Sequence, residues 1–163
     1  MKVSVLLDTS FLISLVDSSR THHSIAALYY KYLLTNECSM YLSSIVAAEI
    51  AIKQPITDLP IKNFITIPFN IPHSIESGRI WNMLDGRDSG DNRSVVKDDM
   101  KIIAQALHEK IPFILTDDVK TFYKHCERLR ASNNLNIKAI KLSDGFTPST
   151  LRLDGQTQLD DFT

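Results

Sequence analysis

The sequence predicts an α/β protein, a three-layer α/β/α sandwich with a mostly parallel central sheet. Short branched apolar runs alternate with longer segments of helical periodicity along nearly the whole chain. The first apolar run is uninterrupted, which is typical of a strand that is covered on both faces. The chain has 163 residues, of which 44% are hydrophobic, enough for one domain with a substantial core. Crossover helices between parallel strands would cover both faces of such a sheet.

Two helices follow the first predicted strand. Residues 3–7 form this strand, a continuous branched run that ends at Asp8. Residues 9–16 repeat apolar side chains at helical spacing, and residues 22–34 do the same with three tyrosines among them. Residues 40–42 then predict a short second strand.

The third predicted helix, residues 45–53, begins at a serine and ends before Pro55. Either Ser43 or Ser44 can cap it, because a serine hydroxyl accepts a hydrogen bond from an unpaired N–H group of the first turn. Residues 64–69 follow as the third predicted strand.

The second half of the chain continues the alternation. Residues 72–84 predict a helix with a proline near its first turn, and the polar decapeptide at 85–94 predicts a loop. The clearest helical pattern covers residues 94–110. A buried strand at 112–115 and a further helix at 117–130 follow it.

The chain ends in a last strand and a polar segment. Residues 136–142 predict the strand, whereas residues 145–163 are polar and rich in turn-forming residues. We therefore expect one domain over residues 1–144 and a C-terminal extension over residues 145–163.

Composition and charge restrict the partners and the compartment. The 18 Lys and Arg residues balance 19 Asp and Glu residues, so a polyanion has to be held by local positive charge or by a metal. Cys38 and Cys126 match no metal-binding spacing, and the chain shows no secretion signal, which favours a reducing cytoplasm. No apolar stretch is long enough to span a bilayer, so no membrane partner is expected.

Two carboxylates interrupt apolar helix faces. When the helix at 94–110 is projected at about 100° per residue, Asp99 falls near the centre of the apolar stripe and Asp98 lies to one side. Glu49 interrupts the stripe of the helix at 45–53 in the same way. An unpaired buried charge is costly, so each acid needs a helix cap, a basic partner or a metal ion.

Further carboxylates come directly after predicted strands. Asp8 follows the first strand, and Asp117 and Asp118 follow the strand at 112–115. Ligand sites of parallel sheets gather at this carboxyl edge, although an Asp at such a turn is also a good helix cap. If acids from four separate elements converge, a divalent cation has to offset their repulsion, and all-oxygen ligands select Mg²⁺ or Mn²⁺. No histidine or cysteine cluster competes for the metal in the sequence.

These motifs resemble those of PIN-domain nucleases over roughly residues 1–142. LLDTSFLISLV is similar to the family's opening motif, and Asp8 takes the place of the Asp that ends strand one. SSIVAAEIAI supplies the second acid, Glu49, within a helix. DMKIIAQALHEKIPFILTDDVKTF is similar to the third block, an Asp, an alanine-rich helix, a short strand and Thr-x-Asp. It places Asp99 and Asp118 as the third and fourth acids.

The resemblance implies a metal-dependent endoribonuclease, and the size of the chain is similar to that of the VapC-like toxin branch. Asp8 and Asp99 would be primary ligands of Mg²⁺ or Mn²⁺. Glu49 would be a ligand or orient the attacking water, and Asp118 would complete the set. An RNA substrate, a small antitoxin protein and a homodimer are the implied partners. Thr121 departs from the pattern, because the family often has a further acid there.

Neighbouring polar side chains are further candidates. Four residues are expected to support the metal ligands, or else to serve as ordinary turn and cap residues: Thr9, Ser10, Thr116 and Asp117. Basic residues flank the predicted acidic edge and are candidate phosphate contacts or solvated charges: Lys53, Arg79, Arg87, Arg93, Lys97 and Lys101.

Other functions fit these motifs less well. A hydrolase of the haloacid dehalogenase type needs a second Asp two residues after the first, where this chain has Ser10. A receiver domain needs an Asp at the end of its central strand, which the MYLSS stretch lacks. The alternative from another class is a non-catalytic PIN-like module that binds RNA or protein, with the acids in structural roles. Retention of all four acids favours the nuclease.

Overall fold

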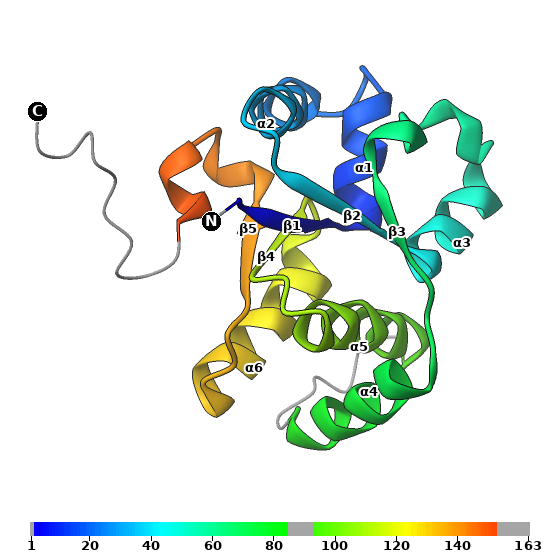
Figure 1. The fold of residues 1–163 in the computed structure, drawn as a ribbon, viewed down its shortest axis with the longest axis vertical. Coiled ribbons are helices and arrows are strands. Elements are labelled where there is room, and N and C mark those ends of the chain that lie inside the picture. The colour runs from blue at the N-terminus through cyan, green and yellow to red at the C-terminus, as the bar shows by residue number, and fades with distance from the viewer. Residues whose placement is uncertain (1, 85–92, 153–163) are drawn as a thin grey trace, which may run out of the picture.

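A five-stranded, all-parallel sheet forms the middle layer of the computed structural model, which describes residues 2–84 and 93–152 (Figure 1). The predicted three-layer α/β/α fold is confirmed. Most of the loop predicted at 85–94 and the end of the extension lie outside the described residues. The sheet order is β3-β2-β1-β4-β5, and the strands are β1 (Ser4–Leu7), β2 (Ser39–Ser43), β3 (Ile65–Ile67), β4 (Phe113–Thr116) and β5 (Lys138–Lys141).

In the described residues, six α-helices surround the sheet: α1 (Thr9–Val16), α2 (His23–Thr35), α3 (Ser44–Lys53), α4 (Ile71–Met83), α5 (Arg93–His108) and α6 (Lys124–Asn133). Figure 1 shows α1 and α2 on one face and α4, α5 and α6 on the other. The chain steps outward from β1 to β3 and then returns to β4 on the other side of β1. Right-handed crossovers in these two directions place their helices on opposite faces.

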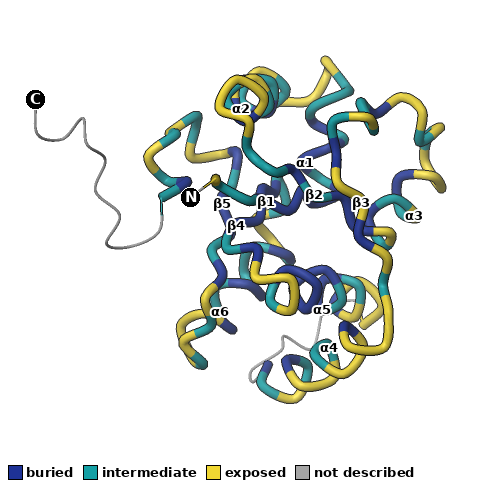
Figure 2. Tube along the Cα trace, viewed as in Figure 1, coloured by how far each residue is buried: buried dark blue, intermediate teal, exposed yellow. Residues whose placement is uncertain are grey.

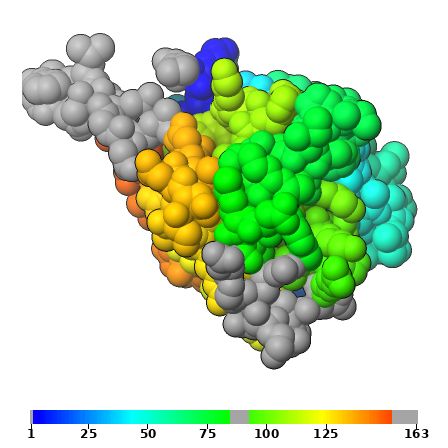
Figure 3. Space-filling model, turned by 90° about the horizontal axis from the view of Figure 1, so that it is seen from below, coloured from blue at the N-terminus to red at the C-terminus, as the bar shows by residue number. Residues whose placement is uncertain are grey.

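Two helices extend beyond the simple layers. α3 contacts both α1 and α5, so it bridges the two helical layers. α4 packs on the outside of α5, and Figure 3 shows α4 in green across the face seen from below. No helix within the described segments has both the length and the apolar character needed to cross a bilayer.

The core lies along β1 and β4, whose residues are almost all fully buried (Figure 2). Both strands are short apolar runs, as expected for central strands that are covered on two faces. Large aromatic side chains fill the space around them: Phe113 from β4 itself, and Phe11, Tyr29 and Phe122 from the helical layers. A dense core of this kind holds the ends of β1 and β4 in fixed positions.

The chain after β5 returns to the face of α2. Phe146 packs edge-on against Tyr29 and Tyr32, with ring centroids 5.0 and 6.0 Å apart. Leu151 is buried, with 2% of its surface exposed. Residues 145–152, the start of the predicted extension, therefore pack against the domain, while the division at residue 144 stays a prediction.

Candidate active site

The carboxyl ends of β1 and β4 lie side by side at the centre of the sheet. The connections that leave these two strands run to opposite faces, which leaves a crevice between them. Open α/β sheets bind their ligands at such a switch point. Asp8 immediately follows β1 here, and Asp117 and Asp118 follow β4.

Four carboxylates from four segments line one cavity of about 370 Å³ at this crevice: Asp8, Glu49, Asp99 and Asp118. The structure thus brings together the four acids that the sequence singled out. We call this cavity the acid pocket. Its other lining residues are Thr9, Ser10, Ile13, Arg20, Ile52, Lys53 and Val95. Another cavity, of about 480 Å³, lies near the opposite ends of β4 and β5, and none of its described lining residues is acidic.

Hydroxyl groups from two segments orient Asp8. Ser10 Oγ and Thr116 Oγ1 each donate to Asp8 Oδ2, both at 2.8 Å. The same hydroxyls accept hydrogen bonds from the backbone N–H groups of Asp117 and Asp118, at 2.8 and 3.0 Å. The loop after β4 and the residue after β1 are therefore tied together through these two hydroxyls.

The start of α3 fixes the position of Glu49. Ser43 caps the helix, since its Oγ accepts from the N–H group of Ile45 at 3.0 Å, which decides between the two predicted serines. Glu49 lies on the side of α3 that faces α1, and the Thr9 hydroxyl donates to Glu49 Oε2. Thr9 thus supports Glu49, whereas Ser10 and Thr116 support Asp8.

Asp99 lies on the inner side of α5, with 7% of its surface exposed. Asp98 instead pairs with Lys101 on the same helix, with 2.9 Å between the carboxylate and the ammonium group. The helical projection correctly placed Asp99 on the buried side of the helix and Asp98 to one side of it. Asp99 Oδ2 also lies 3.1 Å from Nδ1 of His125, a fully buried residue near the start of α6.

His125 is the partner of a pocket acid that sequence reasoning missed. It falls between buried Phe122 and Leu129 at helical spacing, so it interrupts an apolar stripe as Asp99 does. The criterion that selected Asp99 would also have selected His125.

Asp118 begins a π-helical turn, η3 (Val119–Tyr123), that precedes α6. Its Oδ1 accepts from the N–H group of Thr121 at 2.9 Å, and its Oδ2 accepts from the Thr121 hydroxyl. The residue that departs from the family pattern therefore holds Asp118. Helical turns of this wide type occur frequently at functional sites.

Asp117 reaches the acid pocket through its backbone alone. Its side chain accepts from Ser14 Oγ at 2.7 Å and lies 2.6 Å from Nδ1 of His22. Asp117 and His22 border a neighbouring cavity, to which Arg20 also contributes. The predicted supporting role of Asp117 therefore falls on its N–H group rather than on its carboxylate.

The predicted phosphate contacts are only partly near the pocket. Lys53 lines it, and so does Arg20, which the sequence did not single out. Lys101 is engaged by Asp98. Arg79 is paired with Glu76. Arg93 and Lys97 are exposed on α5, and Arg87 lies outside the described residues.

Burial and repulsion raise the pKa values of three acids in the pocket: Asp8, Glu49 and Asp99. Loss of solvent raises the pKa of Asp8 to about 7, hydrogen bonds from the two hydroxyls oppose this shift, and repulsion by Asp99 adds to it. Burial likewise raises the pKa of Asp99 to about 6, against the hydrogen bond from His125. Burial also raises the pKa of Glu49. In the described parts of the chain, no lysine or arginine forms an ion pair with a pocket acid.

The model of one family, the PIN domain, matches residues 5–127 of the chain. The chain belongs to the PIN domain family. The match includes all four acids of the pocket, and family membership agrees with nuclease activity in general. No match is found among curated proteins.

Solved structures share the PIN fold of this chain. VapBC2 from Rickettsia felis, bound to a DNA fragment from its promoter, has a TM-score of 0.59 and 16% identity, covering 84% of this chain and 98% of that one. FitAcB from Neisseria gonorrhoeae has a TM-score of 0.58 and 16% identity, covering 85% and 98%. DNA-bound VapBC from Salmonella typhimurium has a TM-score of 0.55 and 16% identity, covering 86% and 98%. At these identities the likeness concerns the fold.

This PIN domain also brings together two histidines that are distant in the sequence. Ligand atoms of His73, His108 and Glu109 all lie within 4.8 Å of one another. The sequence showed no histidine cluster, because these residues come from the start of α4 and the end of α5.

Proposed function

We propose that this PIN domain is a metal-dependent endoribonuclease that hydrolyses RNA phosphodiesters. The observation that supports it most directly is the convergence of four carboxylates on the acid pocket without a lysine or arginine ion pair in the described chain. A buried group of carboxylates with raised pKa values is typical of a functional site.

The acid pocket fits a divalent cation. Its donors are carboxylate and hydroxyl oxygens, the ligands that Mg²⁺ and Mn²⁺ prefer. A bound cation would also remove the repulsion that contributes to the raised pKa values of Asp8 and Asp99. These two acids are the proposed primary ligands, and Glu49 and Asp118 complete the set.

The protein's own groups position the reactants in this proposal. The cation, when bound, would supply Lewis acidity and make water a better nucleophile. Ser10 and Thr116 hold the carboxylate of Asp8, and Thr9 holds that of Glu49, so that the ligands need little rearrangement. Glu49 is only partly buried, which suits a group that orients the attacking water. 

Two basic side chains are available to hold the RNA. Arg20 and Lys53 are exposed, lie at the rim of the acid pocket and can contact the phosphates that flank the scissile bond. Two other sequence candidates, Arg79 and Lys101, are engaged in ion pairs with Glu76 and Asp98.

We further propose that the protein is the toxin of a toxin–antitoxin pair. Its support is the sequence resemblance together with the fold shared with VapBC2 and FitAcB. Apolar side chains at the rim of the acid pocket suit a small protein partner: Ile52 is 86% exposed and Val95 is 40% exposed. Growth arrest on expression, relieved by a co-encoded small protein, would test this role, and sedimentation of the purified chain would test the homodimer.

A pair of neighbouring variants tests the nuclease. Purified protein should cleave single-stranded or structured RNA with Mg²⁺ or Mn²⁺ and stop with EDTA. Asp99→Asn should abolish cleavage and remain folded, because the amide keeps the size of the side chain. Asp98→Asn is the matched control, since Asp98 pairs with Lys101 and does not line the pocket. Gel-resolved cleavage rates and circular dichroism are the measurements.

The two outcomes separate the nuclease from a binding module. If Asp99→Asn cuts RNA as fast as the wild type, the assignment of the acid pocket is wrong. If folded wild-type protein binds RNA but cleaves none with either metal, the non-catalytic PIN-like module is the better description.

A further inference from the structure

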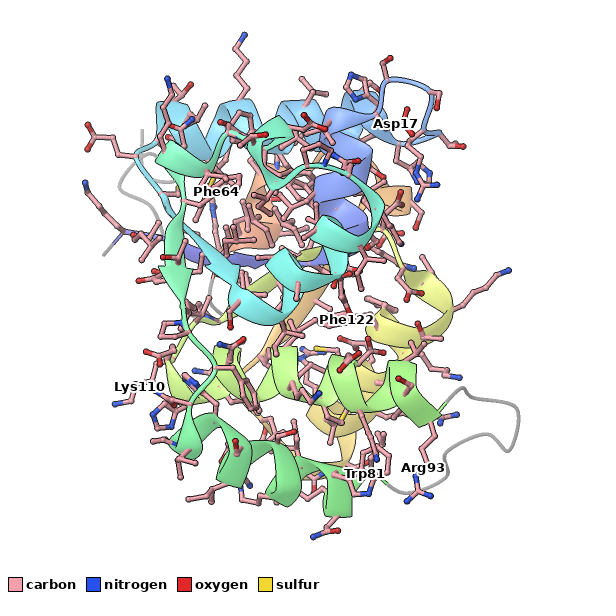
Figure 4. The ribbon with its side chains drawn as sticks, turned by 90° about the vertical axis from the view of Figure 1, so that its right-hand side faces the viewer. Asp17, Phe64, Trp81, Arg93, Lys110 and Phe122 are labelled. Atoms are coloured by element: carbon pink, nitrogen blue, oxygen red, sulfur yellow. The ribbon has the colours of Figure 1, made fainter. Side chains whose placement is uncertain are left out.

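The end of α5 that is remote from the acid pocket carries a second group of potential metal ligands. His108 and Glu109 lie at the C-terminal end of α5, and His73 lies in the first turn of α4. Figure 4 marks this end of α5 with Lys110 and the other end with Arg93. Asp99 lies more than two helical turns before His108, so the two groups are separate.

A helix cap holds His73 in place. Nδ1 of His73 accepts from the N–H group of Asn70 at 3.2 Å, and Asn70 Oδ1 accepts in return from the N–H group of His73. The imidazole is fully buried and lies beside the ring of Phe69, with the centroids 5.8 Å apart. Nε2 is directed at Glu109 Oε1, which is 2.7 Å away.

A second cap fixes the other two side chains. Lys110 adopts a left-handed conformation, with φ of 56°, and its N–H group donates to the carbonyl of Leu107 at 3.2 Å. The N–H group of Ile111 donates to the carbonyl of Ala106 at 2.8 Å. This pair of bonds is a Schellman motif, anchored by the buried side chain of Ile111. It places His108 and Glu109 at the last helical position and the cap.

We propose that His73, His108 and Glu109 form a binding site for Zn²⁺ or a similar transition metal, separate from the acid pocket. The His73 and His108 rings pack edge to face, with their centroids 5.0 Å apart. Two imidazoles and one carboxylate are a frequent zinc donor set, and water can take the remaining position. Imidazole ligands select zinc, nickel or copper over Mg²⁺ and Mn²⁺, which the acid pocket suits.

Metal binding exchanges one set of hydrogen bonds for coordination. In the metal-free protein, Nδ1 of His73 accepts from Asn70, so Nε2 carries the proton and donates it to Glu109. A metal at Nε2 requires the proton to move to Nδ1, and the bond from Asn70 is lost. Metal–nitrogen and metal–oxygen bonds thereby replace two hydrogen bonds of His73: the capping bond from Asn70 and the bond to the partly exposed Glu109.

A metal bound at this site would cross-link α4 and α5. Its ligands come from the start of one helix and the end of the other, and these helices pack against each other along their length (Figure 4). A metal that binds the folded state and not the unfolded chain stabilises the fold in proportion to its affinity. Bound Zn²⁺ should therefore raise the melting temperature of the protein.

Calorimetric titration with Zn²⁺ tests the site, with Co²⁺ absorption as a second probe of the ligand set. The wild type and Asp99→Asn should each bind one equivalent at this site. His108→Ala, which changes an exposed residue, should weaken this binding by more than about 100-fold, since losing an outer-shell partner alone costs about 10–100-fold. His23→Ala is the matched histidine control and should bind as the wild type does.

The comparison of variants decides the proposal. It is overturned if His108→Ala binds Zn²⁺ as tightly as the wild type, or if the wild type binds none. It is also overturned if binding disappears in Asp99→Asn, because the metal would then occupy the acid pocket. Zn²⁺ should raise the melting temperature of wild type and His23→Ala but not that of His108→Ala.

Discussion

Asp8 is a carboxylate whose ionised form the folded protein tolerates poorly. It is 5% exposed, and its neighbour in the acid pocket, Asp99, is an acid as well. The pKa of Asp8 therefore lies at about 7, above the ordinary value of 3.8 that it has in the unfolded chain. Between these two values the folded state binds more protons than the unfolded state, so stability decreases as the pH rises.

The metal-free protein should therefore lose stability as the pH is raised from about 4 to about 7. Asp99, with its pKa raised to about 6, contributes in the same direction within a narrower window. The total loss is expected to be on the order of 3–6 kcal/mol, because each unit of pKa difference corresponds to about 1.4 kcal/mol and the contribution of Asp99 is coupled to that of Asp8. Urea unfolding in EDTA at a series of pH values measures this change.

Saturating Mn²⁺ should reverse this trend, because the metal binds the ionised carboxylates. Stability of the metal-free protein that increases from pH about 4 to about 7 would contradict the assignment of raised pKa values to the acid pocket.

Asp8→Asn should make the metal-free protein more stable at neutral pH, by on the order of 1–3 kcal/mol. Asn Oδ1 can accept from both Ser10 and Thr116, and the variant carries no charge to repel Asp99. Thermal unfolding in EDTA measures the gain.

A second aspartate provides the control for this variant. Asp17 is partly exposed and accepts hydrogen bonds from Ser19, which lower its pKa, so Asp17→Asn should bring no gain in stability. Equal melting temperatures for the wild type and Asp8→Asn would contradict this prediction, because they would mean that other groups already offset the buried charge of Asp8.

The ends of the helices contain strain that a single substitution can relieve. Lys110 and Asn134 both have left-handed backbones, with φ of 56° and 50°. Lys110→Gly should stabilise the metal-free protein by about 0.5–1 kcal/mol, because glycine adopts this conformation without steric cost. Asn134→Gly is the control and should gain less, since asparagine tolerates the left-handed region better than lysine does. Equal gains in urea unfolding would contradict this explanation.

Helices and strands with strong apolar patterns were predictable to within a few residues. α1 matches its predicted range, and the projection separated Asp99 from Asp98 correctly, because helical geometry depends on local spacing. The π-helical turn η3 was not predicted. Its start depends on hydrogen bonds between Asp118 and Thr121, which a pattern of apolar residues does not encode.

Contacts between distant segments account for what the sequence could not reveal. The hydrogen bond between His125 and Asp99 joins α6 to α5, and the contact of His73 with Glu109 joins α4 to the end of α5. Local spacing identifies which face a side chain occupies but not which residue lies opposite. The shared position of Asp8 and Asp118 was predictable because parallel strands have one carboxyl edge, whereas the approach of Glu49 and Asp99 depends on how α3 and α5 pack.

At the scale of the whole molecule, the segment after β5 packs against the rest of the domain. Leu151 is buried, so Leu151→Ala should destabilise the protein by about 2–4 kcal/mol through lost burial and a residual cavity. Ile71→Ala is the control, because Ile71 is 73% exposed and its truncation should change stability little. Urea unfolding of both variants is the measurement, and equal stabilities would mean that residues 145–152 are not part of the cooperative unit.

The central position of β1 has a consequence for synthesis of the protein. β1 is synthesised before β4, yet it needs β4 to complete the middle of the sheet. Asp8 and Glu49 are therefore present in the nascent chain before Asp99 and Asp118 are synthesised. A nascent chain that ends before α5 carries only Asp8 and Glu49 and lacks β4, so it cannot assemble the acid pocket.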